Sequence, residues 1–151
     1  MNLSIYSDAL GLFSYDETTK KIKNCEGNIY WSLNSNNITD AKQLLLVAES
    51  LFSSIEVFHK QVRTSVAAYL LDYKNDFWPE YDENDPTLNW EAVDAGEYNI
   101  TQEKFVSSIR LYDVVISKEV IYCEFDDGDL FGGHRIHATF SNDLKLLEAS
   151  I

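Results

Sequence analysis

The chain has 151 residues, 45% of them hydrophobic and 13% aromatic, a size and composition typical of one globular domain and not of a disordered chain. Its 25 acidic and 12 basic residues give a formal net charge of −13. This charge argues against nucleic acid or an anionic membrane as a directly bound partner and favours a basic protein.

The N-terminus lacks the basic residues and the uninterrupted apolar core of a signal peptide. No apolar run approaches the roughly 20 residues that span a bilayer. We therefore expect a single cytoplasmic domain over residues 1–151. Cys25 and Cys123 lie outside any C-x-x-C pair, so each is expected to be a small apolar side chain in or near a strand.

Short apolar stretches separated by turn-forming residues occupy the first part of the chain, up to about residue 37. They are Leu12–Tyr15, Ile22 and Ile29–Leu33. Turn residues between short apolar runs predict two or three antiparallel strands.

A long helical pattern follows, with Thr39 or Asp40 as a suitable N-cap. Apolar residues recur at gaps of three and four, which predicts one buried helical stripe. A helix reaching Asp72 would be unusually long, so two helices broken near Ser53-Ser54 stay open as an alternative. The stripe consists of Leu44, Ala48, Leu51, Phe52, Ile55, Phe58, Val62, Val66, Tyr69, Leu70 and Tyr73.

The helical spacing disappears at about residues 76–98, a stretch with both prolines, eight acidic residues and no basic one. We predict an acidic loop or insertion here. After it, Thr101 can cap a short helix that contains Phe105.

Strands are predicted again in the last part of the chain, at Tyr112–Ile116, Glu119–Asp126, Leu130–Phe140 and Leu144–Ala149. Strands, then helices, then strands indicate an α+β fold. We expect an antiparallel sheet of N- and C-terminal strands packed against a central helical layer.

The sharpest local motif runs from Phe125 to Ile136. Asp127-Gly128 is a strong signal for a two-residue hairpin turn, which would place Asp126 opposite Asp129. A calcium loop fits poorly, because a histidine stands where the bidentate glutamate should be. We expect no metal and no cofactor.

Two histidines follow this turn on a predicted strand. His134 shares parity with Ile136, so we expect it to point inward, whereas His137 is expected in solvent. A general base at His134, oriented by Asp127 or Asp129, stays open as an enzymatic alternative. The sequence contains no G-x-S-x-G motif.

Aromatic residues are interleaved with carboxylates in the acidic segment, and further carboxylates lie at the hairpin. Such aromatic residues often anchor protein interfaces, and carboxylates attract basic partners. Alternatively, the tryptophans fold onto the core and the acids are simply solvated. The candidate partner-binding residues are Asp76, Trp78, Glu80, Tyr81, Asp82, Glu83, Asp85, Trp90, Asp126, Asp127, Asp129 and His134.

At the hairpin the chain resembles a bacterial family known as domain of unknown function twenty-two sixty-two. The matching residues are Phe125, Asp127-Gly128-Asp129-Leu130-Phe131, Gly133-His134 and Ile136, with support from Asn75-Asp76-Phe77-Trp78 and Phe105. The resemblance implies no enzyme activity. Small acidic bacterial domains of this kind often serve as immunity proteins of polymorphic or contact-dependent toxin systems.

We therefore expect an immunity protein that binds a basic toxin domain, such as a nuclease, and occludes its active site. One alternative is a small enzyme or ligand-binding domain centred on His134, Asp127 and Asp129. Another is an acidic mimic of nucleic acid that inhibits a DNA-binding protein. The sequence leaves the oligomeric state open.

Overall fold

A computed structural model describes residues 3–78, 86–87 and 89–151. Within these residues the chain forms eight strands and four helices. The strands are β1 (Ser4–Ser7), β2 (Gly11–Asp16), β3 (Lys21–Asn24), β4 (Tyr30–Leu33), β5 (Arg110–Ile116), β6 (Val120–Asp126), β7 (Ile136–Ser141) and β8 (Leu146–Ser150). The helices are α1 (Ile38–Ser53), α2 (Ile55–Phe77), α3 (Trp90–Asp94) and α4 (Gln102–Ser108).

The strands form one sheet in sequence order, from β1 to β8. Neighbouring strands are antiparallel except for β4 and β5, which are parallel. All four helices lie between these two strands in the chain, and a parallel pair requires such a long crossover. The α+β prediction is confirmed.

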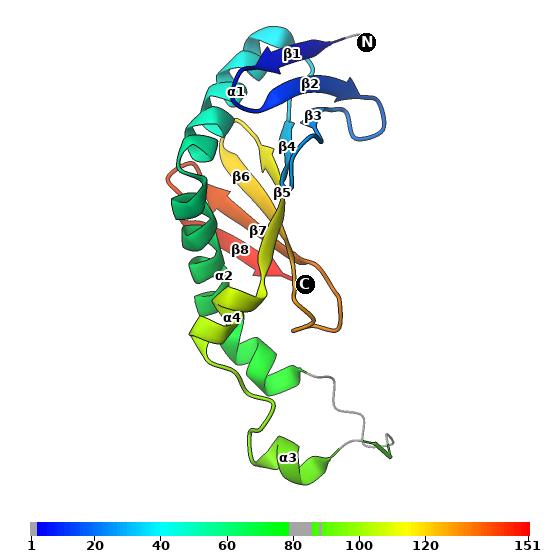
Figure 1. Cartoon of the computed structure of the whole chain (residues 1–151), viewed down its shortest axis with the longest axis vertical. Coiled ribbons are helices and arrows are strands. Elements are labelled where there is room, and N and C mark those ends of the chain that lie inside the picture. Colours follow the sequence, from blue (N-terminus) through cyan, green and yellow to red (C-terminus); the bar gives the residue numbers. More distant parts are fainter. Residues whose placement is uncertain (1–2, 79–85, 88) are drawn as a thin grey trace.

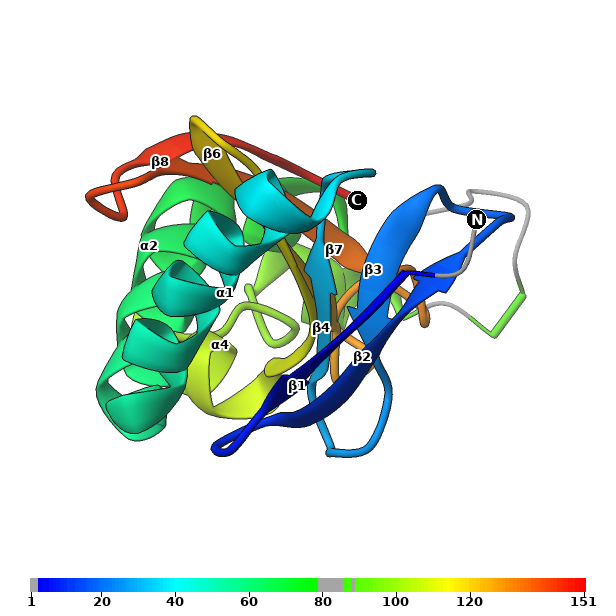
Figure 2. The ribbon, with the colours of Figure 1, turned by 90° about the horizontal axis from the view of Figure 1, so that it is seen from above.

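The two long helices lie end to end along one side of the sheet (Figure 1). Helix α1 contacts β1, β4 and β5, and α2 contacts β5, β8 and α4. Seen from above, the strands curve around these helices from β8 to β1 (Figure 2). None of the helices in the described part of the chain is both long and apolar enough to cross a membrane.

The helical segment breaks at Ser54, with φ −128° and ψ 47°, so the two-helix alternative is confirmed. The N-cap of α1 is Asn37, not Thr39 or Asp40, because its side chain accepts a hydrogen bond from the amide of Asp40 at 2.8 Å. Thr101 caps α4 as predicted, accepting from the amide of Lys104 at 3.1 Å.

The core lies between the inner face of the sheet and the helices. Along β6 and β7, buried residues alternate with half-buried ones, as expected when one sheet face is covered. Cys123 is buried in this core as predicted, but Cys25 is exposed in the loop after β3. Large side chains that are fully buried include Phe13, Ile22, Leu33, Phe105, Leu111, Ile116, Ile121, Phe125, Phe131, Ile136 and Phe140.

Two tyrosines predicted in the core stripe of α2 lie outside it. Tyr69 is 61% exposed and Tyr73 is 41% exposed. The buried positions of α2 advance in steps of four, from Phe58 to Leu70 and on to Lys74. Tyr69 and Tyr73 each come one residue before a buried position, about 100° away around the helix.

A histidine ties α2 to the sheet. The Nε2 atom of His59 accepts a hydrogen bond from the amide of Leu111 at 3.0 Å. Burial lowers the pKa of this imidazole to about 4, and the charges of Arg63 and Arg110 add to the effect. The ring is therefore neutral at pH 7 and can act as an acceptor.

The core assignment predicts different costs for two Phe→Ala substitutions. Phe140 is fully buried, whereas Phe77 is 59% exposed. Phe140→Ala should lower the free energy of unfolding by about 3–5 kcal/mol because it leaves a cavity. Phe77→Ala should lower it by less than about 1 kcal/mol. Urea denaturation of both variants measures this, and equal losses would contradict the assignment.

Candidate functional site

The two ends of the acidic segment lie next to each other at the last turn of α2. The buried Nζ of Lys74 donates to the carbonyl oxygens of Trp78 at 3.1 Å and Tyr98 at 2.6 Å. The Asn75 amide group both donates to the Ile100 carbonyl at 3.1 Å and accepts from the Ile100 amide at 2.9 Å. Burial lowers the pKa of Lys74. Two adjacent side chains thus hold both ends of the segment together.

The structure separates the aromatic candidates of this segment. Trp78 is only 8% exposed, and its ring lies 5.7 Å from Phe131 and 5.8 Å from His134 between centroids. It folds onto the core, as the alternative reading expects. Trp90, at the start of α3, is 42% exposed and Asp76 is exposed. Candidates Glu80, Tyr81, Asp82, Glu83 and Asp85 lie outside the described residues.

The loop between β6 and β7 contains two tight turns. In the first, the Leu130 amide donates to the Asp127 carbonyl at 3.1 Å, and Gly128 and Asp129 have φ of 57° and 64°. In the second, the His134 amide donates to the Phe131 carbonyl at 3.3 Å. Its central residues, 132 and 133, are glycines with φ of 66° and 89°, and positive φ at both centres marks a type I′ turn.

The predicted two-residue hairpin is therefore wrong. Strand β7 begins only at Ile136, and Asp126 pairs with Arg110 of β5 and not with Asp129. The loop packs against the end of α4, where a Cβ on Gly128 would overlap the carbonyl oxygen of Ser108. This tertiary contact requires glycine at the first central position of the turn.

Asp127 organises the loop from inside. Its carboxylate accepts hydrogen bonds from the amides of Asp129 at 3.1 Å, Phe131 at 2.9 Å and Gly133 at 3.0 Å, and the residue is 3% exposed. Asp127 therefore has a structural role in the loop, and its carboxylate is withdrawn from the surface.

The other loop candidates lie on the surface. Asp126, Asp129 and His134 are all exposed. The prediction that His134 points inward is wrong, because β7 begins after it and strand parity does not apply. Instead its imidazole lies against the edge of Trp78, so the loop and the base of the acidic segment meet at this point.

An exposed row of aromatic side chains lies beside this loop, and we call it the aromatic ridge: Tyr69, Tyr73 and Phe77 of α2. They are 61%, 41% and 59% exposed and spaced four residues apart. The Tyr73 ring lies 5.4 Å from that of Phe77 and stacks on the buried Phe131 at 6.0 Å. The helical pattern could not identify the ridge, because its spacing is the spacing of a core stripe.

Carboxylates border the aromatic ridge. Asp72 and Asp76 are exposed on the same stretch of α2. Asp126 and Asp129 are exposed on the loop whose Phe131 packs against Tyr73. The structure thus brings together three carboxylates that the sequence predicted as site residues and three aromatic residues that it did not predict as site residues.

A polar cluster on the uncovered face of the sheet was also missed. A bulge between Leu111 and Asp113 turns both Tyr112 and Asp113 toward this face. Asp113 pairs directly with Glu124, which pairs with His137 on the next strand. Alternate residues of a strand lie on the same face of the sheet, and this rule applied to β6 and β7 could have placed Glu124 and His137 on one face. The bulge breaks the rule in β5.

Aromatic and basic groups complete this cluster. The Arg135 guanidinium lies 3.8 Å from the centroid of the Tyr112 ring, and its Nε is 3.8 Å from the Glu124 carboxylate. His137, expected in solvent, is half-buried, with its Nδ1 hydrogen-bonded to the hydroxyl of Tyr122. Burial raises the pKa of Tyr122 to about 12, with a further contribution from Glu124.

Asp113 is in an unfavourable environment for a charged carboxylate. Its Oδ1 atom is buried and accepts no hydrogen bond from the residues that the structure describes. Burial raises its pKa, and the neighbouring charge of Glu124 raises it further. Over the described ranges, no three histidine, cysteine, aspartate or glutamate side chains are grouped as a metal site requires.

The structural role of Asp127 predicts a large stability cost for its removal. Asp127→Ala should lower the free energy of unfolding by at least about 2 kcal/mol, because it removes the acceptor of the buried Phe131 amide and of two partly buried amides. Asp126→Ala, which removes an exposed acceptor of the Gly128 amide, should cost below about 1 kcal/mol. Similar losses for the two variants, measured by urea denaturation, would reject this role.

The raised pKa of Asp113 predicts a pH-dependent gain from Asp113→Asn. A carboxyl whose pKa is higher in the folded state binds more protons when folded, so its contribution to stability falls as pH rises through the shifted pKa. Asp113→Asn should therefore be more stable than the wild type at pH 7 and lose that advantage below pH 4. Thermal unfolding across this range tests it, with Asp126→Asn as the control. A constant difference between variant and wild type at all pH values would contradict it.

Comparison with known proteins identifies a family for this chain. No curated protein and no solved structure is significantly similar to this chain. A family model described as "Uncharacterized protein conserved in bacteria (DUF2262)" matches residues 7–151, which include the aromatic ridge, the β6–β7 loop and the polar cluster. The chain therefore belongs to the bacterial family DUF2262.

Proposed function

We propose that this domain is an immunity-type inhibitor that binds a basic protein, a bacterial toxin domain, and blocks its active site. The aromatic ridge and the carboxylates around it form the binding surface. No residue of the domain is assigned a catalytic role in this proposal.

The observation that carries the proposal is the exposed aromatic ridge on a stretch of the chain that is rich in carboxylates and poor in basic residues. From Thr64 to Glu103 the sequence has ten acidic residues and one basic residue, Lys74. Lys74 is 4% exposed and donates to backbone carbonyls. Its charge is therefore withdrawn from the surface that Tyr69, Tyr73 and Phe77 occupy.

Each part of this surface suits a different step of binding. Exposed carboxylates attract a basic protein and raise the association rate at low salt. Aromatic side chains lose little conformational entropy and fill pockets on a partner, which slows dissociation. Because the Tyr73 ring packs on Phe131 and the Phe77 ring packs on Tyr73, these two members of the ridge are held in place before binding.

Capture from a lysate of the source bacterium, followed by kinetics with the purified partner, tests the proposal. The wild type should retain a basic protein, less strongly at high salt. Tyr69→Ala with Phe77→Ala should weaken affinity by roughly 30-fold through faster dissociation. Asp72→Lys with Asp76→Lys should slow association by about tenfold at low salt.

The matched controls lie away from the aromatic ridge. Tyr6→Ala removes a side chain that is 68% exposed on β1, and Glu119→Lys reverses an exposed charge in the β5–β6 turn. Neither should change binding. The captured protein should also be toxic when expressed in a bacterial host, and co-expression of this domain should restore growth. A partner that binds both α2 variants as tightly as the wild type would exclude this surface, and absence of any basic partner would exclude the function.

A further inference from the structure

The edge of the sheet at β8 adjoins the aromatic ridge. β8 is the last strand in the sheet order, so one of its edges pairs with no strand of the described chain. Figure 2 shows β8 at one end of the curved sheet, next to α2, and the two elements are in contact. An edge strand presents unpaired amides and carbonyls that can pair with a strand of another protein.

A hollow lies between this edge and α2. Its volume is about 490 Å³, and its lining residues are Tyr69, Leu70, Tyr73, Ala149, Ser150 and Ile151. Ala149 pairs with the buried Ala138 of β7, so its side chain is on the inner face of the sheet. A strand added to β8 would therefore bring its inward side chains into the hollow, against the exposed rings of Tyr69 and Tyr73.

β8 has few of the features that usually protect a free edge. It contains no lysine and no proline, and its Leu147 is 58% exposed. Its pairing with β7 is irregular between Thr139 and Phe140, but it is regular from Glu148 to Ser150. Natural edges are commonly blocked by lysine, proline or a bulge. Here the irregularity is confined to the first half of the strand, and the second half is open to pairing.

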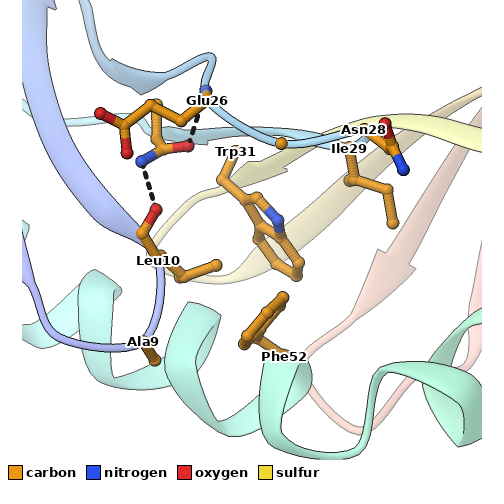
Figure 3. A pocket seen from close by; sticks show the side chains of 9 residues that line it. Ala9, Leu10, Glu26, Asn28, Ile29, Trp31 and Phe52 are labelled. Atoms are coloured by element: carbon orange, nitrogen blue, oxygen red, sulfur yellow. Dashed lines mark hydrogen bonds between the residues drawn. The ribbon is translucent and has the colours of Figure 1, made fainter.

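At the other end of the helical layer, the aromatic residue of the helix has a partner within the sheet. Figure 3 shows Phe52 of α1 facing the Trp31 indole of β4, with the ring centroids 6.4 Å apart in an edge-to-face arrangement. The adjoining turn is held by Asn24, whose side chain donates to the carbonyl of Leu10 at 2.7 Å. β8 has no aromatic residue that could supply such a partner for Tyr69.

Exposed carboxylates lie on both elements that flank the hollow. Glu148 is exposed in β8, and Asp72 and Asp76 are exposed on α2. A second copy of this chain would bring its own Glu148 and its net charge of −13 to the same edge, and this repulsion disfavours pairing between copies. The charge favours a basic segment instead.

We propose that an extended basic segment of the partner adds to the sheet as a ninth strand beside β8. Its backbone pairs with the free edge, its apolar side chains enter the hollow against Tyr69 and Tyr73, and its basic side chains are attracted by Glu148 and Asp72. The inference rests on the proposed function in taking the partner to be the basic protein that the aromatic ridge binds.

The probe is the peptide acetyl-KVKFKVK-amide, which alternates basic and apolar residues as such a strand requires. The control, acetyl-KKVFVKK-amide, has the same composition and charge without the alternation. Binding to the full chain is followed by NMR through the backbone amide signals. The alternating peptide should shift the signals of residues 69–73 and 146–150 saturably, and the control should bind at least about tenfold more weakly.

Two methylated forms of the alternating peptide test strand pairing itself. Successive amides of a strand point to opposite edges, so methylation of the lysine amides and methylation of the valine and phenylalanine amides block opposite edges of the peptide. One form should lose binding and the other should keep it. Equal binding of the two forms would exclude pairing with β8.

Substitutions in the protein locate the site. Tyr69→Ala and Glu148→Lys should each weaken binding of the alternating peptide by about tenfold. Their controls should not change it: Tyr6→Ala, on the opposite edge strand β1, and Glu119→Lys, in the β5–β6 turn. All four side chains are exposed, so the variants should remain folded, which unchanged amide signals elsewhere verify. Loss of binding with Tyr6→Ala would place the peptide on β1 and overturn the proposal.

Three further results would also overturn it: unmoved β8 signals, equal binding of the alternating and control peptides, or a dimer of the chain, seen by sedimentation, that the peptide dissociates. The last result would assign the edge to a second copy. The capture experiment separates this inference from the proposed function. A toxin bound by the aromatic ridge without strand pairing would keep the function and reject the ninth strand, whereas peptide binding without any captured basic protein would keep the edge site and reject the function.

Discussion

Burial of Phe131 is the interaction on which the functional half of the molecule depends. The ring is fully buried and contacts Tyr73 of α2, Trp78 after α2 and Phe105 of α4. To insert this ring, the chain after β6 must fold back on itself twice within a few residues. The Asp127 carboxylate makes this possible by accepting three amides that would otherwise be unsatisfied near the core.

The same packing determines what the surface presents. With Phe131 inserted, Asp126 and Asp129 remain outside while the aromatic ridge of α2 lies beside the loop. Lys74 also determines the character of this surface. Its hydrogen bonds hold the two ends of the acidic segment together, and its burial removes the only basic residue between Thr64 and Glu103 from the surface. Stability and surface chemistry are thus products of one set of contacts. The cost of burying an ammonium group is offset by two carbonyl acceptors.

Features encoded by local signals were predictable from the sequence. The α+β order, the break at Ser54 and the Thr101 cap each depend on a few neighbouring residues. Features set by tertiary contact were not. Asp127-Gly128 carries a true turn signal, but packing of Gly128 on Ser108 displaces the turn by one residue. Tyr69 and Tyr73 have core spacing, yet they lie one residue away from the buried row of α2, and the bulge at Tyr112 cannot be predicted from the alternation of strand residues.

Amide hydrogen exchange is the most direct test of the central claim that the aromatic ridge and the adjoining loop bind the partner. Exchange would be compared for the protein alone and in complex with the captured basic protein. The account predicts slower exchange in residues 69–77 and 126–134 of the complex, with little change in β1 and β2. Protection confined to the N-terminal strands or to the uncovered face of the sheet would contradict it.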